Sequence, residues 1–191
     1  MKFEYIKKKL IDLRSEVAVD NEIGHYDINK IVEDVYVHVL NDVYGWNLKN
    51  ANLIQENFPA IDLVDVDNEI VIQVTSSTDT GKLRGTIEKF KKLDAYSSYD
   101  LKMFYINGMP NFQKQSLEEF AKSNVKKSDL LGIKNILEMA ESDLDICEKV
   151  YETFQKIFSD AEKSTVSITV NGDVKGVVNA ESGSVINQTI S

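Results

Sequence analysis

Two segments near the N-terminal end repeat apolar residues at the alternating three- and four-residue spacing of an amphipathic helix. In the first segment the repeated positions form a narrow seam suited to packing on another helix: Phe3, Ile6, Leu10, Leu13 and Val17. In the second segment they form one face: Ile28, Ile31, Val32, Val35, Val39 and Val43. Asp27 is the expected N-cap of this second helix, and Gly45 ends it. His38 lies beside valines, which favours a partly buried, hydrogen-bonded histidine over a catalytic one.

The pattern changes to that of β-strands in the segment IDLVDVDNEIVIQVTSS, residues 61–77. It predicts a hairpin whose strands, at 61–66 and 69–76, pair antiparallel, with acidic residues on the first strand and an apolar run on the second. Asp65 and Asp67 lie close to the turn, so we expect both to be exposed.

The segments on either side of the hairpin extend this sheet. Pro59 fits the start of the first strand because proline cannot donate into a ladder, and the connection 47–57 before it has room for a short strand. A helix from about residue 82 to 94 follows the hairpin, and then a strand at 100–107, DLKMFYIN. The order strand, helix, strand predicts a right-handed crossover and a parallel strand pair in a mixed sheet, with helices on both faces.

The C-terminal part of the chain is predicted to be helical and then β-forming. Helices are expected at 112–121, from Ile133 to Ala140, and after residues 142–145, SDLD, which resemble a capping box. The last 28 residues, 164–191, alternate β-forming residues and repeat Gly-x-Val without any proline. We therefore divide the chain into a domain of residues 1–140, a helical extension at 141–163 that packs on it, and a β-forming tail at 164–191.

Composition narrows the class of protein. The chain has 191 residues, 42% of them hydrophobic, which is enough for one ordinary domain with a real core. No apolar run is long enough to cross a bilayer, and the charged N-terminus is unlike a secretory signal. A lone Cys147 allows no internal disulfide, and one Cys with two widely separated His gives no zinc site. These features indicate a protein of the reducing cytoplasm without a membrane partner.

The charge is unevenly distributed. The net charge of −9 argues against a surface that is basic throughout, yet the segment 82–92, KLRGTIEKFKK, concentrates cations on one helix. A solvated charged face is one interpretation of this run. The other is contact with nucleic-acid phosphates through Lys82, Arg84, Lys89 and Lys92.

The hairpin carries the chemistry that a metal-dependent phosphodiesterase needs. Asp62 lies between the apolar residues Ile61 and Leu63, where an acidic residue has no simple structural reason to be. On the second strand Gln73 and Thr75 project to one face, because side chains alternate along a strand. Oxygen ligands of this kind suit Mg²⁺ or Mn²⁺, and Glu33 would supply another if its helix crosses the site. The alternative for Gln73 and Thr75 is a satisfied polar strand end with helix-capping hydroxyls.

The order of an acidic strand, a turn, a strand with Gln-x-x and a helix resembles the restriction-endonuclease-like PD-(D/E)XK superfamily. Asp62 matches the acid of that motif and Gln73 matches its Glu or Gln position, while Thr75 stands where the superfamily has lysine. Family members can move the lysine to a neighbouring helix, so the resemblance implies that Lys82 or Lys89 takes its place. The implied fold is α/β, a restriction-endonuclease-like mixed sheet flanked by helices. The implied catalytic set is Asp62, Gln73, Thr75, Lys82 and Lys89, with Asp62, Glu33 and Gln73 at the metal.

Four longer pieces resemble the SMEK domain of bacterial proteins, which is found near mobile-element and defence genes. They are YDINKIVEDVY, NFPAIDLVD, IVIQVTSS and KLRGTIEKF, and together they cover roughly residues 1–140. This resemblance implies a nuclease-like fold and a role in antiphage defence.

Two functions remain open from the sequence. The first is a metal-dependent nuclease domain acting on DNA or RNA. The second is a catalytically inactive nuclease-like fold that binds nucleic acid or a partner and transmits a signal, which the replacement of lysine by Thr75 favours. In either case the tail at 164–191 is expected to mediate self-assembly, or docking to a partner defence protein, by strand pairing; the alternative is a terminal hairpin that folds back on its own domain.

Overall fold

The structure of the chain is a computed structural model that describes residues 1–25, 27–53 and 60–163. Its main helices are α1 (Lys2–Glu22), α2 (Asp27–Tyr44), α3 (Thr80–Phe90), α4 (Lys114–Ala121), α5 (Ile133–Ser142) and α6 (Leu144–Lys163). Its strands are β1 (Lys49–Asn50), β2 (Leu63–Asp65), β3 (Ile70–Thr75), β4 (Asp100–Tyr105) and β5 (Leu130–Gly132). The predictions made for Pro59 and for the tail at 164–191 fall outside the described residues. No helix in the described part of the chain is long and apolar enough to cross a membrane.

The strands form one mixed sheet in the order β1-β2-β3-β4-β5. β2 pairs antiparallel with β3, with Leu63 opposite Ile72, which confirms the predicted hairpin. β4 lies parallel to β3 on the other side, which confirms the predicted crossover through α3. β1 confirms a short strand before the hairpin. The sequence did not predict β5, because three residues are too few to show a period.

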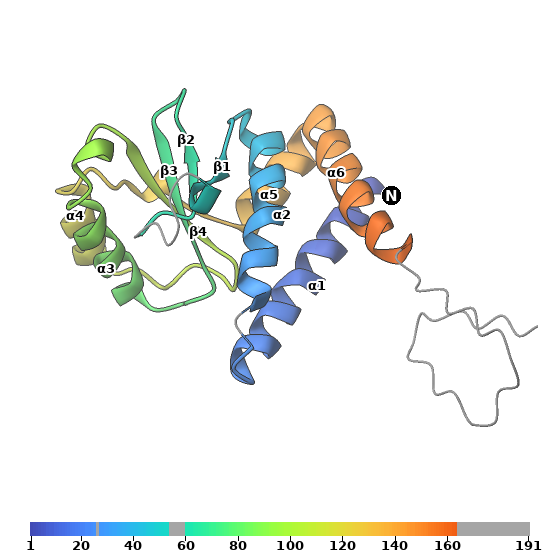
Figure 1. Cartoon of the computed structure of the whole chain (residues 1–191), viewed down its shortest axis with the longest axis horizontal. Coiled ribbons are helices and arrows are strands. Elements are labelled where there is room, and N and C mark those ends of the chain that lie inside the picture. Colours follow the sequence, from blue (N-terminus) through green and yellow to red (C-terminus); the bar gives the residue numbers. More distant parts are fainter. Residues whose placement is uncertain (26, 54–59, 164–191) are drawn as a thin grey trace, which may run out of the picture.

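Helices cover both faces of the sheet, as predicted (Figure 1). On one face α1, α2, α5 and α6 pack together over β3 residues Ile70, Ile72 and Val74. On the other face α3 and the segment around α4 cover Val71 and Leu101. The alternation of β3 side chains between two apolar layers explains why this strand is a nearly continuous hydrophobic run. α6 contributes Val150 and Phe154 to the first layer, so the helical extension packs on the N-terminal helices.

Three local expectations about burial were wrong, each for a tertiary reason. Ile31 is 60% exposed because the packed stripe of α2 is centred on Val32, Val35 and Tyr36 instead. His38 is exposed for the same reason. Asp65 is fully buried, where it accepts hydrogen bonds from the turn and from Asn47.

The start of the last helix also differs from the expected capping box. Asp143, rather than Ser142, caps α6, because its carboxylate accepts the backbone N–H groups of Asp145 and Ile146. The short helix predicted from residue 112 begins at Lys114, and Phe112 packs against Tyr105 and Phe120 instead.

Candidate active site

Asp62 lies where β2 leaves its partner strand. Its backbone N–H donates to the carbonyl of Ile72 at 3.0 Å, and its own carbonyl accepts from the N–H of Ala51 at 2.7 Å. Two residues earlier Ala60 has φ +63°, a left-handed conformation. The backbone of Asp62 is therefore fixed on both sides before its side chain makes any contact.

The Asp62 carboxylate accepts a backbone hydrogen bond from β3 that a neighbouring strand would otherwise accept. Val74 on β3 has no partner from β2 at this level, and its N–H donates to Asp62 Oδ2 at 2.7 Å. The Gln73 amide nitrogen donates to the same oxygen. Burial raises the pKa of Asp62 to about 6, although the Val74 hydrogen bond, Lys82 and Gln73 each lower it. The buried carboxylate is thus held in position without full compensation of its charge.

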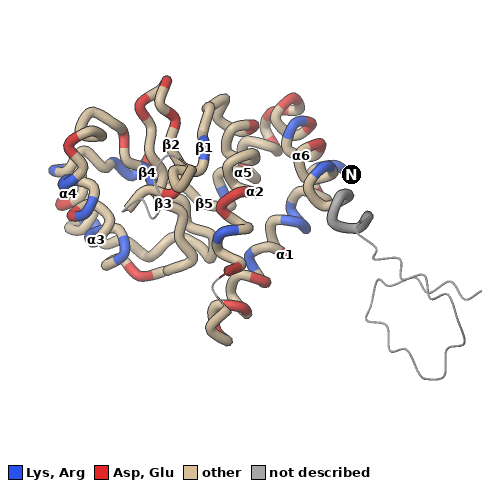
Figure 2. Tube along the Cα trace, viewed as in Figure 1, with Lys and Arg blue, Asp and Glu red and all other residues tan. Residues whose placement is uncertain are grey.

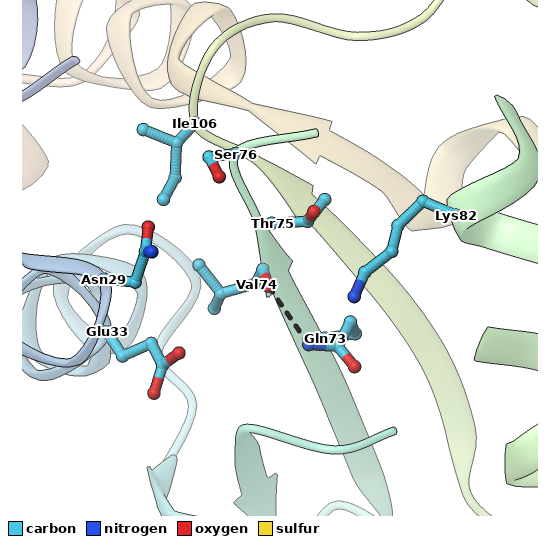
Figure 3. Close-up of a pocket in the computed structure, with 8 residues that line it drawn as sticks. All are labelled: Asn29, Glu33, Gln73, Val74, Thr75, Ser76, Lys82 and Ile106. Atoms are coloured by element: carbon cyan, nitrogen blue, oxygen red, sulfur yellow. Dashed lines mark hydrogen bonds between the residues drawn. The ribbon is translucent and has the colours of Figure 1, made fainter. Parts of the chain in front are cut away.

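Gln73 is oriented by two acceptors. Its side-chain nitrogen also donates to the Val74 carbonyl at 3.1 Å, which Figure 3 marks. The amide oxygen points the other way and accepts no hydrogen bond from another described residue. Gln73 therefore faces Asp62 with its amide nitrogen, and its amide oxygen is directed away from that carboxylate.

Glu33 reaches the same place from α2. Burial is the main reason that its pKa rises to about 7, and the charges of Asp62 and Asp34 raise it further. Lys30 and Lys82 act in the opposite direction. Glu33 makes no hydrogen bond or ion pair with any other residue that the structure describes. A half-buried carboxylate near another carboxylate, with no direct partner, is typical of functional sites.

The structure separates the two candidate lysines. Lys82, in the first turn of α3, reaches toward Gln73 (Figure 3) and lowers the pKa of both carboxyl groups. Lys89 lies about two helical turns further along α3 and does not line this pocket. Of the two lysines that the sequence left open, Lys82 lines this pocket and Lys89 does not.

The remaining members of the basic helix have other surroundings. Arg84 donates through Nε and Nη2 to the two carboxylate oxygens of Glu119 on α4, at 3.2 and 3.0 Å. Lys92 follows the end of α3 and is exposed. Neither residue lines the pocket around Gln73.

Four of the predicted residues line a pocket of about 210 Å³ (Figure 3): Glu33, Gln73, Thr75 and Lys82. Figure 3 shows Glu33 on the α2 side, Lys82 on the α3 side, and Gln73 and Thr75 on the strand between them. The Thr75 hydroxyl accepts the N–H of Ser77 at 3.1 Å in the turn after β3, whereas the cap of α3 is the Asp79 carboxylate, which accepts the Gly81 N–H. Of the predicted set, the structure brings Glu33, Asp62, Gln73, Thr75 and Lys82 together and leaves Lys89 outside.

Two further polar lining residues were not predicted, Asn29 and Ser76. Asn21 joins them: its amide nitrogen donates to Ser76 Oγ at 2.9 Å and its amide oxygen accepts from Asn29 at 3.0 Å. The polar run that ends β3 was a signal for Ser76, but nothing local to the sequence places Asn29 or Asn21 beside it.

The donor set fits a hard divalent cation. Within the described residues there is no group of three or more His, Cys, Asp or Glu side chains that could hold a metal. Magnesium retains several waters and is commonly bound through one or two carboxylates. Asp62 and Glu33 supply two carboxylates, and a half-turn of the Gln73 amide, whose nitrogen now donates to Asp62, would direct its oxygen to the same place. The set contains only oxygen donors, which suits Mg²⁺ or Mn²⁺ better than zinc.

A family model described as the SMEK domain matches residues 5–141 of the chain. The matched range contains all of these side chains. Neither a curated protein nor a solved structure matches the chain.

Proposed function

The chain belongs to the SMEK domain family, and we propose that it is a metal-dependent, nuclease-like phosphodiesterase that cuts DNA or RNA. The observation that carries the proposal is the convergence of Glu33, Gln73 and Lys82 from three elements on one pocket beside Asp62. Two carboxylates and a nearby ammonium are groups that this reaction uses. Thr75 in the usual lysine position no longer argues strongly against hydrolysis, because Lys82 supplies a cation from the neighbouring helix.

Each residue has a distinct role in the proposed mechanism. Asp62 and Glu33 would hold Mg²⁺ or Mn²⁺, with the Gln73 amide as a further oxygen donor once turned over. Such a metal would supply a water of lowered pKa and neutralise charge on the scissile phosphate. Lys82 contacts a phosphate oxygen, where its charge stabilises the transition state. Thr75 fixes the end of β3, since its hydroxyl holds the Ser77 N–H.

The proposal is tested by incubating the purified full-length protein with plasmid, single-stranded DNA and RNA, with Mg²⁺, Mn²⁺ or a chelator. We expect cleavage of at least one substrate only when metal is present. Glu33→Gln should remove that activity while Glu88→Gln, an exposed glutamate on α3, should leave it intact. Activity of the Glu33→Gln variant equal to that of the wild type would refute the assignment of the site.

The second candidate function is a catalytically inactive nuclease-like fold that binds nucleic acid or a partner for signalling. Two observations favour it: the threonine at position 75 and the acidic net charge of −9. If no substrate is cut with either metal but nucleic acid is bound, this second function replaces the first. A titration with Mn²⁺ adds an independent criterion, because only the first function requires a binding signal that Asp62→Asn abolishes.

We extend the proposal to antiphage defence and to assembly through residues 164–191, which lie outside the described part of the chain. The family resemblance supports the first, and the alternating β-forming sequence of the tail supports the second. A chain ending at residue 163 should sediment as a smaller species than the full chain. Identical sedimentation of both chains, with no partner lost on truncation, would contradict the role of the tail.

A further inference from the structure

A second pocket, of about 340 Å³, lies at the opposite end of α3 from the candidate active site. The two pockets share no lining residue. The second pocket is lined by the end of α3, the start of β4 and the segments just before β4 and just after α4: Ile87, Phe90, Lys91, Ser97, Ser98, Tyr99, Asp100, Leu101, Lys122, Ser123, Asn124 and Val125.

The inner wall of this pocket is apolar and partly aromatic. Ile87, Leu101 and Val125 are buried in the core beneath it. Phe90 and Tyr99 are half-buried, and the Tyr99 ring packs edge-on against Tyr96 with centroids 4.9 Å apart. Aromatic rings held in this way can stack on a nucleobase, and every base offers a π-face for it.

Cations and hydroxyls form the rim. The Lys91 ammonium donates to Ser123 Oγ at 2.9 Å, which fixes it between α3 and the end of α4. Lys122 precedes Ser123 directly, and neither lysine forms an ion pair with another described residue. An ammonium group held beside a serine hydroxyl, with a second lysine next to it in the lining, suits a phosphate group.

Asp100 is the acidic residue in the lining of the second pocket. It is exposed in the same lining, where its negative charge would repel a phosphate. A carboxylate in a nucleotide site is instead suited to accept hydrogen bonds from ribose hydroxyls. The nearby Ser98 hydroxyl donates to the Glu69 carboxylate at 3.2 Å and not to Asp100. The Asp100 carboxylate is therefore available to accept from a ligand hydroxyl.

We infer that this second pocket binds a ribonucleotide unit, with its base against Phe90 and Tyr99, its phosphate on Lys91 and Lys122, and its ribose on Asp100. The same chemistry is offered by a free ribonucleotide and by one residue of an RNA strand. Figure 2 marks basic positions along α3 and α4, with acidic positions among them, and the 11 residues of α3 span about 16 Å between the two pockets. An RNA strand following α3 would place one nucleotide here and a phosphate near Lys82; this extension alone rests on the proposed function.

The test measures binding to the full-length protein in a chelator, so that no cleavage occurs. The probes are AMP, deoxy-AMP, a labelled single-stranded RNA and the DNA of the same sequence. Lys91→Ala/Lys122→Ala should weaken RNA binding about tenfold or more and reduce its salt dependence by about one unit of slope for each lost contact. Asp100→Asn should lower the preference for RNA over DNA without a comparable loss of DNA affinity.

The matched control is Lys8→Ala/Lys156→Ala, which removes the same charge from exposed positions on α1 and α6. Binding of AMP that is lost in the pocket variant identifies a free nucleotide as a ligand, whereas loss with RNA alone identifies part of an RNA-binding surface. Equal affinities of the pocket variant and the control, or no ribonucleotide binding by the wild type, would overturn the inference.

Cleavage assays with metal keep the two proposals separate. A wild type that binds RNA through Lys91 and Lys122 but cuts nothing would remove the proposed function and keep the pocket. A wild type that cuts nucleic acid while the pocket variant binds as the control does would remove the pocket and keep the function.

Discussion

Each end of the β2–β3 hairpin contains an aspartate: Asp65 is buried at the turn, and Asp62 is half-buried at the other end. The two carboxylates differ in how completely they are hydrogen-bonded. At the turn, both carboxylate oxygens of Asp65 are satisfied. Oδ2 accepts the Asn47 N–H and the Asn68 amide, both at 2.7 Å, and Oδ1 accepts the N–H groups of Asp67 and Asn68 at 3.1 Å. Burial raises the pKa of Asp65, but these hydrogen bonds outweigh it, so the pKa lies below its ordinary value.

At the other end, Asp62 is only partly satisfied. One of its oxygens accepts from Val74 and Gln73, and burial still raises its pKa to about 6. Glu33 and Lys82 lie nearby without bonding to it directly. A buried carboxylate with a complete set of donors stabilises a turn, whereas one with an incomplete set and a second carboxylate beside it can bind a ligand.

Asp62→Asn should have the largest effect. We expect metal-dependent cleavage to fall at least about 1,000-fold, since charge stabilisation by a bound metal contributes several kcal/mol. Folding should be retained, because asparagine keeps an oxygen that can accept the Val74 N–H. Cleavage rates and a thermal melt on the same preparation measure both. An active, stable variant would show that Asp62 is not a metal ligand.

Asp65→Ala should have the opposite profile. Removing an acceptor of several backbone N–H groups should cost about 3 kcal/mol of folding free energy, while the pocket residues stay in place in the molecules that remain folded. Urea denaturation measures the loss. Asp67→Ala is the matched control, since Asp67 is exposed and accepts a hydrogen bond from the Asn47 side chain at 3.2 Å. Equal costs for the two substitutions would contradict the special role of Asp65.

Lys82→Ala tests which cation serves the site. We expect cleavage to fall about 100-fold, the typical cost of losing one group that stabilises a transition state. Lys89→Ala removes the same charge from the same helix but outside the pocket, and it should change the rate only a few-fold. Steady-state cleavage rates at fixed salt distinguish them. The reverse order would move the site along α3.

The pH dependence of stability should be the smallest effect. A carboxyl group whose pKa is raised on folding favours the folded state when protonated, so its contribution is greatest below the ordinary values of 3.8 for Asp62 and 4.5 for Glu33. That contribution is lost as pH rises through about 6 and about 7, respectively. The contribution of Asp65 to stability depends on pH in the opposite direction, because folding lowers its pKa. It is present above the ordinary value of 3.8 and is lost as pH falls below that value.

Thermal melts between pH 4 and 8 measure this difference. Glu33→Gln should reduce the decline in melting temperature toward pH 7 relative to the wild type, and Glu88→Gln should leave it unchanged. Added Mg²⁺ should raise the melting temperature of the wild type near pH 7 more than that of Glu33→Gln. A parallel pH profile for wild type and Glu33→Gln would argue that Glu33 titrates normally.

Much of the fold could be predicted because its signals are local. The seam from Ile6 to Val17 and the period-two segment at 61–76 each specify an element from neighbouring residues alone. β5 and the exposure of Ile31 could not be predicted this way, since a three-residue strand has no period and the packed stripe of α2 depends on its neighbours. Asp62 and Gln73 were found because a polar residue in an apolar strand is a local anomaly.

The sequence by itself determined the hairpin, the parallel crossover through α3 and the position of an acid among apolar residues, because periodicity and residue type act over a few neighbours. Only the tertiary structure decided that Glu33 and Lys82 lie near Asp62 and that Lys89 lies outside the pocket. It also decided that the Asp65 carboxylate is fully hydrogen-bonded, because the backbone N–H of Asn47, in the segment before β1, donates to it. These outcomes depend on how helices cross the sheet and where strands end, and so on long-range packing that no local pattern records.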